Sequence, residues 1–120
     1  HWDAVMRVNA TANHRLIGTL DPLLRVGKGT CIFVTSGAVQ GCKAYWGAYA
    51  ASKAALETMA RCYAAEVEGL GVTVQVFDPG RFRSSMRAQA YPGENPDTLI
   101  APEEVADQLV ASLPQTQKAA

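Results

Sequence analysis

The sequence predicts an α/β protein: half of an open, doubly wound parallel sheet with the element order helix, strand, helix, strand, helix. Two short runs rich in β-branched and aromatic residues, within residues 30–35 and 72–77, are bounded by glycines and are typical of strands. Apolar residues at helical spacing precede, separate and follow them. This order predicts two parallel neighbouring strands joined by a right-handed helical crossover, within one domain that spans residues 1–120.

The first helix is expected from about Trp2 to Arg25, where apolar residues recur every third or fourth position. Pro22 is expected to kink this helix near its C-terminal end. Gly27 and Gly29 should end the helix before the strand Thr30–Thr35. Because this strand is a compact apolar run rather than an alternating one, we expect it to be buried on both faces.

The middle helix is expected from about Trp46 to Glu68, after a loop over Ser36–Tyr45. Residues Ser84–Ala101 are long for a loop and predict a mobile flap. A last helix should run from Pro102, a residue suited to a first helical turn, to about Leu113. The tail Gln115–Ala120 is expected to be frayed.

The composition argues against several function classes. Lys and Arg number 11, as do Asp and Glu, so the net charge is zero and gives no electrostatic footprint for nucleic acid. No apolar stretch approaches the length that spans a membrane, and no membrane partner is expected. The 3 cysteines lie far apart, which indicates neither a disulfide framework nor a zinc site and favours a reducing, cytoplasmic setting. No metal site is expected.

Polar segments follow both expected strands. Thr35-Ser36-Gly37 comes after the first strand, and Asp78-Pro79-Gly80 comes after the second. In an open parallel sheet, ligands bind beyond the C-terminal ends of the strands. We therefore expect the two segments to face one crevice.

Tyr49 and Lys53 lie four residues apart near the start of the middle helix and therefore share a face. A lysine ammonium close to a phenol favours the phenolate form, and a phenol in such surroundings can give or take a proton at working pH. Taken alone, the pair is better explained by two solvated side chains, since helical neighbours at this spacing are common.

Asn9, Ser36, the segment Tyr49-Ala50-Ala51-Ser52-Lys53 and Pro79-Gly80 occur in that order. Together they resemble the short-chain dehydrogenase/reductase family over essentially the whole chain. The resemblance implies a Rossmann-like fold in which Tyr49 is the general acid or base and Ser36 hydrogen-bonds the same substrate oxygen. It implies that Lys53 assists the phenol and binds the cofactor ribose, and that the backbone of Asn9 holds a water of the proton relay.

The same resemblance implies NAD or NADP as cofactor and a small carbonyl compound or secondary alcohol as substrate. The backbone at Pro79-Gly80 would lie close to the nicotinamide, and Ser84, where the family usually has Thr, would bond its carboxamide. The substrate pocket would draw on the loop from Gly37 to Trp46 and on the flap after Ser84. The first and middle helices would form the interface of a homo-oligomer.

Simpler interpretations stay open for most of these residues. Ser36 could only end a strand, Asn9 could be a solvated helix residue, and Pro79-Gly80 is ordinary in a turn. For Asn13, which matches no family position, we expect a solvated side chain. The arginines and the methionine at the start of the flap indicate either tolerance of an anionic or polar substrate group or a solvated surface; they are Arg83, Met86 and Arg87.

No strand followed by the glycine-rich pattern G-x-G-x-x-G occurs in the sequence, and the chain begins with His1 rather than Met. We interpret it as the C-terminal, catalytic half of such a domain, with the N-terminal half absent. Without the first glycine-rich turn, we expect the chain alone to be catalytically silent and only marginally folded. A truncated dimerisation or binding module is the alternative. The sugar epimerases and dehydratases share the Tyr/Lys pair, but the short spacing from Ser36 to Tyr49 argues against them.

Overall fold

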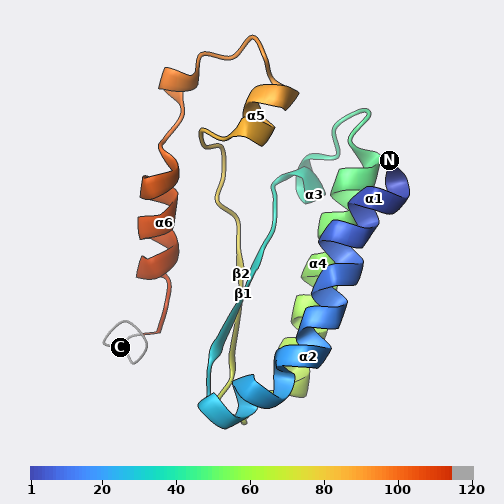
Figure 1. Cartoon of the computed structure of the whole chain (residues 1–120), viewed down its shortest axis with the longest axis vertical. Coiled ribbons are helices and arrows are strands. Elements are labelled where there is room, and N and C mark those ends of the chain that lie inside the picture. The colour runs from blue at the N-terminus through green and yellow to red at the C-terminus, as the bar shows by residue number, and fades with distance from the viewer. Residues whose placement is uncertain (115–120) are drawn as a thin grey trace. The chain divides into compact units, whose positions relative to one another are not determined.

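The computed structural model describes residues 1–114 and divides into two compact units, His1–Asp78 and a second that begins at Pro79 (Figure 1). The tail 115–120, which was expected to be frayed, lies outside the described residues. Within the described part, no helix is both long and apolar enough to cross a membrane.

The first unit opens with one long helix, as predicted. It consists of α1 (Trp2–Met6), a π-helical turn η1 (Arg7–Thr11) and α2 (Ala12–Gly27), which continues through Pro22. Lys28 ends the helix in the left-handed conformation, with φ of 49°. The N–H of Gly29 donates to the carbonyl of Leu24 at 3.0 Å, a bond that satisfies one of the last helical carbonyls.

The two predicted strands form a parallel pair. Strand β1 (Thr30–Val34) and strand β2 (Thr73–Phe77) pair in register from Thr30↔Thr73 to Val34↔Phe77. The N–H of Thr35 donates to the carbonyl of Phe77 at 2.9 Å and extends the ladder by one bond. Between the strands, the helix α4 (Gly47–Glu66) forms the expected crossover element.

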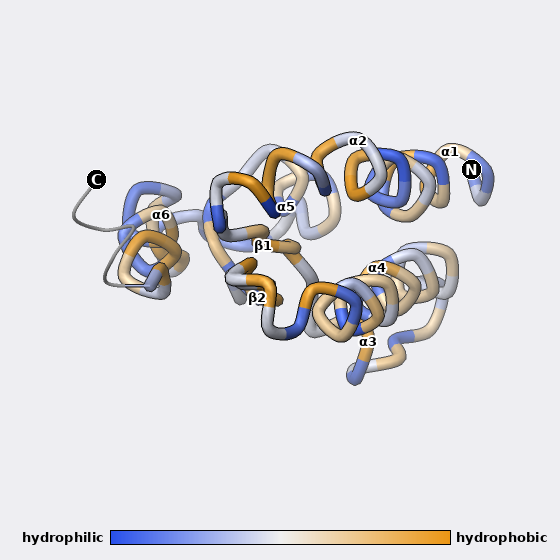
Figure 2. Tube along the Cα trace, turned by 90° about the horizontal axis from the view of Figure 1, so that it is seen from below, coloured by the Kyte–Doolittle hydropathy of each residue, from blue (hydrophilic) through white to orange (hydrophobic). Residues whose placement is uncertain are grey.

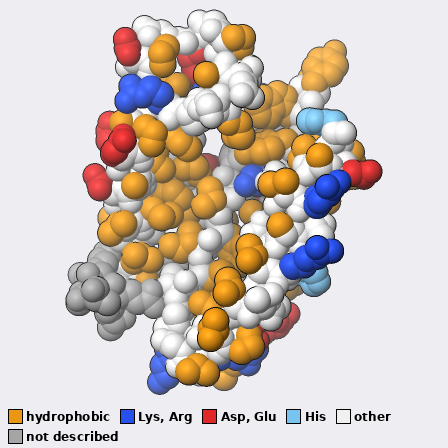
Figure 3. All heavy atoms as spheres, in the orientation of Figure 1, with side chains coloured by type: hydrophobic (Ala, Val, Ile, Leu, Met, Phe, Trp, Pro, Cys, Tyr) orange, Lys and Arg blue, Asp and Glu red, His pale blue; other side chains and the backbone are white. Residues whose placement is uncertain are grey.

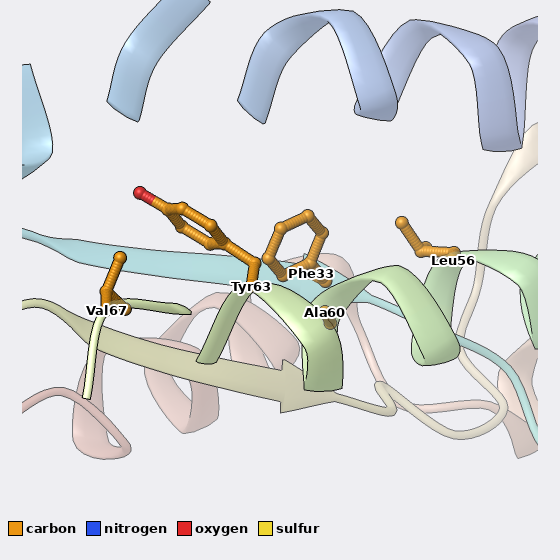
Figure 4. Close-up of a cluster of buried hydrophobic side chains, with 5 residues drawn as sticks. All are labelled: Phe33, Leu56, Ala60, Tyr63 and Val67. Atoms are coloured by element: carbon orange, nitrogen blue, oxygen red, sulfur yellow. The ribbon is translucent and has the colours of Figure 1, made fainter. Parts of the chain in front are cut away.

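The hydrophobic core lies between this sheet and α4 (Figure 4). Phe33 of β1 packs against the side chains on one stripe of α4 and the residue just beyond it: Leu56, Ala60, Tyr63 and Val67. Helices α2 and α4 lie on the same side of the strand pair (Figure 2). This arrangement places the C-terminal end of β1 beside the first turns of α4.

The expectation that the first strand is buried on both faces is wrong. Phe33 is 5% exposed, but its neighbour Val34, which points to the other face, is 46% exposed. The reason is that the helices of this unit cover one face of the strand pair, and successive side chains of a strand point to opposite faces.

Hydrophobic side chains, interspersed with basic ones, cover the visible face of the α1–α2 helix (Figure 3). The large hydrophobic residues exposed along this helix are Trp2, Val8, Leu16, Leu20, Leu23 and Val26. The loop expected over Ser36–Tyr45 also differs from the prediction, because it contains a single helical turn, α3 (Ala38–Gly41).

The second unit corrects the prediction of a long loop over Ser84–Ala101. This segment folds into α5 (Ser85–Ala90) and a 3₁₀ turn, η2 (Pro96–Thr98), and Phe82 forms a parallel bridge with Ile100. The last helix, α6 (Pro102–Ala111), begins at the predicted proline. The carboxylate of Glu104 accepts a hydrogen bond from the N–H of Ala101 at 3.3 Å, which caps the helix start.

Candidate active site

Tyr49 and Lys53 lie in the first two turns of α4, next to the C-terminal end of β1. The Lys53 ammonium donates a hydrogen bond to the carbonyl of Val34 at 2.9 Å, and its Nζ lies 5.9 Å from the centre of the Tyr49 ring. Burial lowers the pKa of Lys53, because removal from water disfavours the charged form. Lys53 is therefore held against the sheet beside the phenol.

A second polar contact fixes the same end of the strand to α4. The hydroxyl of Thr35, which is buried, donates to a carboxylate oxygen of Glu57 at 2.7 Å. Glu57 lies one helical turn after Lys53. The two residues therefore bond, from successive turns of α4, to Val34 and Thr35 at the C-terminal end of β1. With Phe33 packed against Leu56, they determine the position of α4 along β1.

Ser36 follows β1 directly and is partly exposed. Its Oγ accepts a hydrogen bond from the N–H of Ala38 at 3.2 Å, in the turn that leads into α3. A hydroxyl that accepts one bond still carries its own O–H, which can be donated to a further oxygen. Ser36 therefore has both a turn-forming role and a donor suited to a substrate carbonyl.

Asn9 lies in the π-helical turn η1, and its side chain contacts α4. Its Nδ2 donates to the hydroxyl of Ser52 at 3.0 Å, and that hydroxyl donates to the main-chain carbonyl of Tyr49 at 2.7 Å. Ser52 is fully buried. The first helix is thus joined, through one serine, to the backbone of the tyrosine on which the site is centred.

Asn13 is not the solvated residue expected from the sequence. Its Nδ2 donates to the main-chain carbonyl of Asn9 at 2.8 Å, and the residue is partly buried. The sequence interpretation missed both Asn13 and Ser52. The available signal was the spacing: Asn13 follows Asn9 by four residues in a helix, which brings the side chain beside the carbonyl of the preceding turn.

Trp46 borders the tyrosine on its N-terminal side. The two rings of Trp46 and Tyr49 meet edge to face, with centroids 5.8 Å apart and an interplanar angle of 79°. This contact restricts the rotation of the Tyr49 ring and shields one of its edges from water.

The three remaining predicted cofactor-binding residues, Pro79, Gly80 and Ser84, belong to the second unit. Gly80 has φ of 69°, in the left-handed region that favours glycine, and apart from the adjoining residues no atom lies within 4 Å of the position that a Cβ would occupy. The Oγ of Ser84 accepts from the N–H of Arg87 at 3.1 Å and caps α5.

The flap arginine Arg87 fits neither of the two interpretations given from the sequence. Its guanidinium donates two bonds of 2.8 Å to the carboxylate of Glu94 and stacks on the ring of Tyr91, 3.9 Å from its centre. The hydrogen bonds from Arg87 hold the pKa of Glu94 below its usual range. Arg87 therefore links α5 to the segment that follows it, through Tyr91 and Glu94. Arg83 and Met86, in contrast, are exposed. A small pocket of about 220 Å³ lies within this unit, bordered by Ser84, Arg87, Tyr91 and Leu99.

Comparisons with known proteins give a consistent result. The profile of the short chain dehydrogenase family matches residues 1–95. A relative from Escherichia coli (strain K12), the uncharacterized oxidoreductase YciK, is 39% identical over 105 residues, which are 87% of this chain and 41% of the relative.

Two crystal structures resemble the fold closely. A short chain dehydrogenase from Salmonella enterica serovar Typhi has a TM-score of 0.89 at 33% identity, over 99% of this chain and 49% of that chain. A short chain dehydrogenase from Escherichia coli CFT073, complexed with NADPH, has a TM-score of 0.84 at 37% identity, over 90% of this chain and 45% of that chain. The chain spans less than half the length of each of these relatives.

Proposed function

The chain belongs to the short-chain dehydrogenase family of oxidoreductases, and on this premise we propose that the protein interconverts a carbonyl and a secondary alcohol with a nicotinamide dinucleotide. Tyr49 is the proton donor in the direction of reduction. Ser36 steadies the substrate oxygen, and Lys53 supports the phenol and binds the cofactor ribose. Asn9 belongs to the proton relay.

The observation that carries this proposal is the position of Lys53. Its ammonium is half-buried and bonded to the carbonyl of Val34 at the end of β1, within 5.9 Å of the Tyr49 ring centre. A solvated pair on a helix surface has no reason to make such a contact. The C-terminal end of a parallel strand is, in contrast, where this class of sheet binds its ligands.

The residues present fit a nicotinamide dinucleotide. An ammonium has three N–H donors, so its bond to Val34 is compatible with further bonds to two ribose hydroxyls. In the second unit, Gly80 has a left-handed backbone conformation, and the family resemblance gives its backbone a place close to the nicotinamide. We propose NADP(H) as the first cofactor to test, because the related Escherichia coli CFT073 protein is complexed with NADPH.

When bound, the nicotinamide supplies or accepts the hydride. In reduction, the Ser36 hydroxyl donates a hydrogen bond to the substrate carbonyl oxygen and so stabilises the negative charge that grows there. The Tyr49 hydroxyl gives its proton to the same oxygen, which becomes the alcohol. The positive charge of Lys53 stabilises the phenolate that remains until a proton returns along the Asn9 side of the site.

The decisive experiment is Tyr49→Phe in the full-length gene product, assayed by the consumption of NADPH with a panel of small carbonyl compounds. Loss of a general acid lowers kcat by roughly 100-fold or more, and NADPH affinity, measured by fluorescence, should stay near the wild-type value. Tyr63→Phe is the matched control, because it makes the same change on the same helix about 21 Å further along the helix axis. Turnover that survives in Tyr49→Phe would remove the assignment.

A second candidate is a non-turning-over dimerisation or binding module. The hydrophobic side chains exposed along α1–α2 favour it. The two candidates separate in the same assay: the module predicts no Tyr49-dependent turnover by the gene product with any substrate or either nucleotide, together with self-association.

A further inference from the structure

Three hydrogen bonds lie where the first helix meets the start of α4. The Asn13 side-chain amide donates to the carbonyl of Asn9 at 2.8 Å, the Asn9 amide donates to the Ser52 hydroxyl at 3.0 Å, and that hydroxyl donates to the carbonyl of Tyr49 at 2.7 Å. Each side chain donates towards the next residue, in the same sense, and the series ends on the main chain of Tyr49. The two bonds that meet at the Ser52 hydroxyl, one accepted and one donated, polarise and strengthen one another.

The middle of the series is buried. Ser52 is fully buried, and its hydroxyl accepts one bond and donates one. A buried hydroxyl that loses a partner carries the free-energy cost of an unmade hydrogen bond. The bonds at Ser52 are therefore satisfied only while the first helix and α4 keep their present register, which makes this register well defined.

The π-helical turn bears on the first of these bonds, because Asn9 lies inside the turn. Within this turn the bonding pattern shifts, as the N–H of Ala12 bonding to the carbonyl of Arg7, five residues back, shows. The carbonyl of Asn9, inside this turn, accepts the amide of Asn13. This is the carbonyl to which the family resemblance gives a water of the proton relay.

We propose that Asn13 and Ser52 are positioning residues for the reaction: their hydrogen bonds hold the carbonyl and side chain of Asn9 in register with the main chain of Tyr49. This inference rests on the proposed function. Neither residue touches substrate or cofactor. Both act through the placement of Asn9 and Tyr49, the two ends of the proton path.

The test uses Ser52→Ala, Asn13→Ala and the double variant in the full-length gene product. A misplaced proton donor lowers kcat by roughly 10- to 100-fold, while the KM for NADPH stays within about twofold because cofactor contacts are unchanged. The double variant should lose less than the product of the two single losses, since both changes release the same residue, Asn9. Asn13 is partly exposed, so Asn13→Ala keeps the core intact if Ser52→Ala folds poorly.

Two matched controls break bonds of the same kind elsewhere. Thr19→Ala removes a side-chain bond to the carbonyl of Arg15, one turn earlier in α2, and Ser112→Ala removes a bond to the carbonyl of Leu109 after α6. Both should keep wild-type kcat.

The outcomes are separable. In one outcome, wild-type turnover depends on Tyr49, but Asn13→Ala and Ser52→Ala keep wild-type kcat per folded molecule. The bonds then only stabilise the helix pair, and this inference is overturned while the proposed function stands. If the two losses in kcat simply multiply in the double variant, the residues do not act together through Asn9 and the inference is also overturned. If wild type shows no Tyr49-dependent turnover, the proposed function fails and takes this inference with it.

Discussion

Tyr63 has a buried ring in the core and a hydroxyl that reaches α2. That hydroxyl donates to a carboxylate oxygen of Asp21 at 2.9 Å, and the Arg25 guanidinium donates to the same oxygen at 2.8 Å. The bond from Arg25, followed by the bond from Tyr63, holds the pKa of Asp21 below its usual range. Burial, reinforced by the Asp21 bond, raises the pKa of Tyr63 to about 12.

These shifts predict how stability depends on pH. A carboxylate with a lowered folded-state pKa stabilises the fold above its usual value of 3.8, and this contribution is lost as the pH falls below that value. A phenol with a raised folded-state pKa stabilises the fold below its usual value of 10.0, and this contribution is lost as the pH rises towards about 12. Chemical denaturation across both ranges should show the two losses.

Tyr63→Phe should remove the loss of stability at alkaline pH, and Asp21→Asn should remove the loss of stability at acid pH. Each variant leaves the ionisable group of the other residue in place. An alkaline transition that persists unchanged in Tyr63→Phe would assign it to another tyrosine or to a lysine.

The most deeply buried side chains of the first unit lie where α4 packs against the strand pair. Leu56 is almost fully buried beside Phe33. Leu56→Ala should lower the free energy of unfolding by about 2–5 kcal/mol, because the lost transfer energy adds to the cost of a cavity. The measurement is urea denaturation followed by circular dichroism. Leu23→Ala, on the exposed side of α2, is the control and should change the free energy by less than about 0.5 kcal/mol.

The regular elements were predictable because their signals are local. Helical spacing and flanking glycines are enough to position the first helix, both strands and α4, and Pro102 is enough to start α6. Helix α5 was missed since its six residues carry no apolar periodicity; the cap from Ser84 and the Arg87–Glu94 ion pair accompany it in the structure.

The candidate site, too, has a part that local sequence predicts and a part that it does not. The spacing of Tyr49 and Lys53 on one helix was enough to predict that they share a face. The bond of Asn9 to Ser52, 43 residues away, depends on how two helices pack, which no local pattern encodes. The role of Asn13 depends on the irregular turn at Asn9, and π-helical turns have no strong sequence signature.

At the scale of the whole molecule, the hydrophobic side chains on α1–α2 predict self-association of the gene product through its first and middle helices. Light scattering should give at least a dimer. Leu16→Lys, which introduces a charge among these side chains, should shift the equilibrium towards monomer, whereas Thr98→Lys in the second unit should not. A monomeric wild type at micromolar concentration would contradict the prediction.

The π-helical turn Arg7–Thr11 absorbs one additional residue locally, because a backbone bond there spans five residues instead of four. Removing one residue, for example the exposed Val8, would restore regular α-helical spacing while the helix on either side keeps its rotation about the axis. Val5 and Met6, which are partly buried on the α1 segment that packs against α4, would then still face it. The deletion should instead disturb Asn9, which lies inside the turn and contacts Ser52 from there.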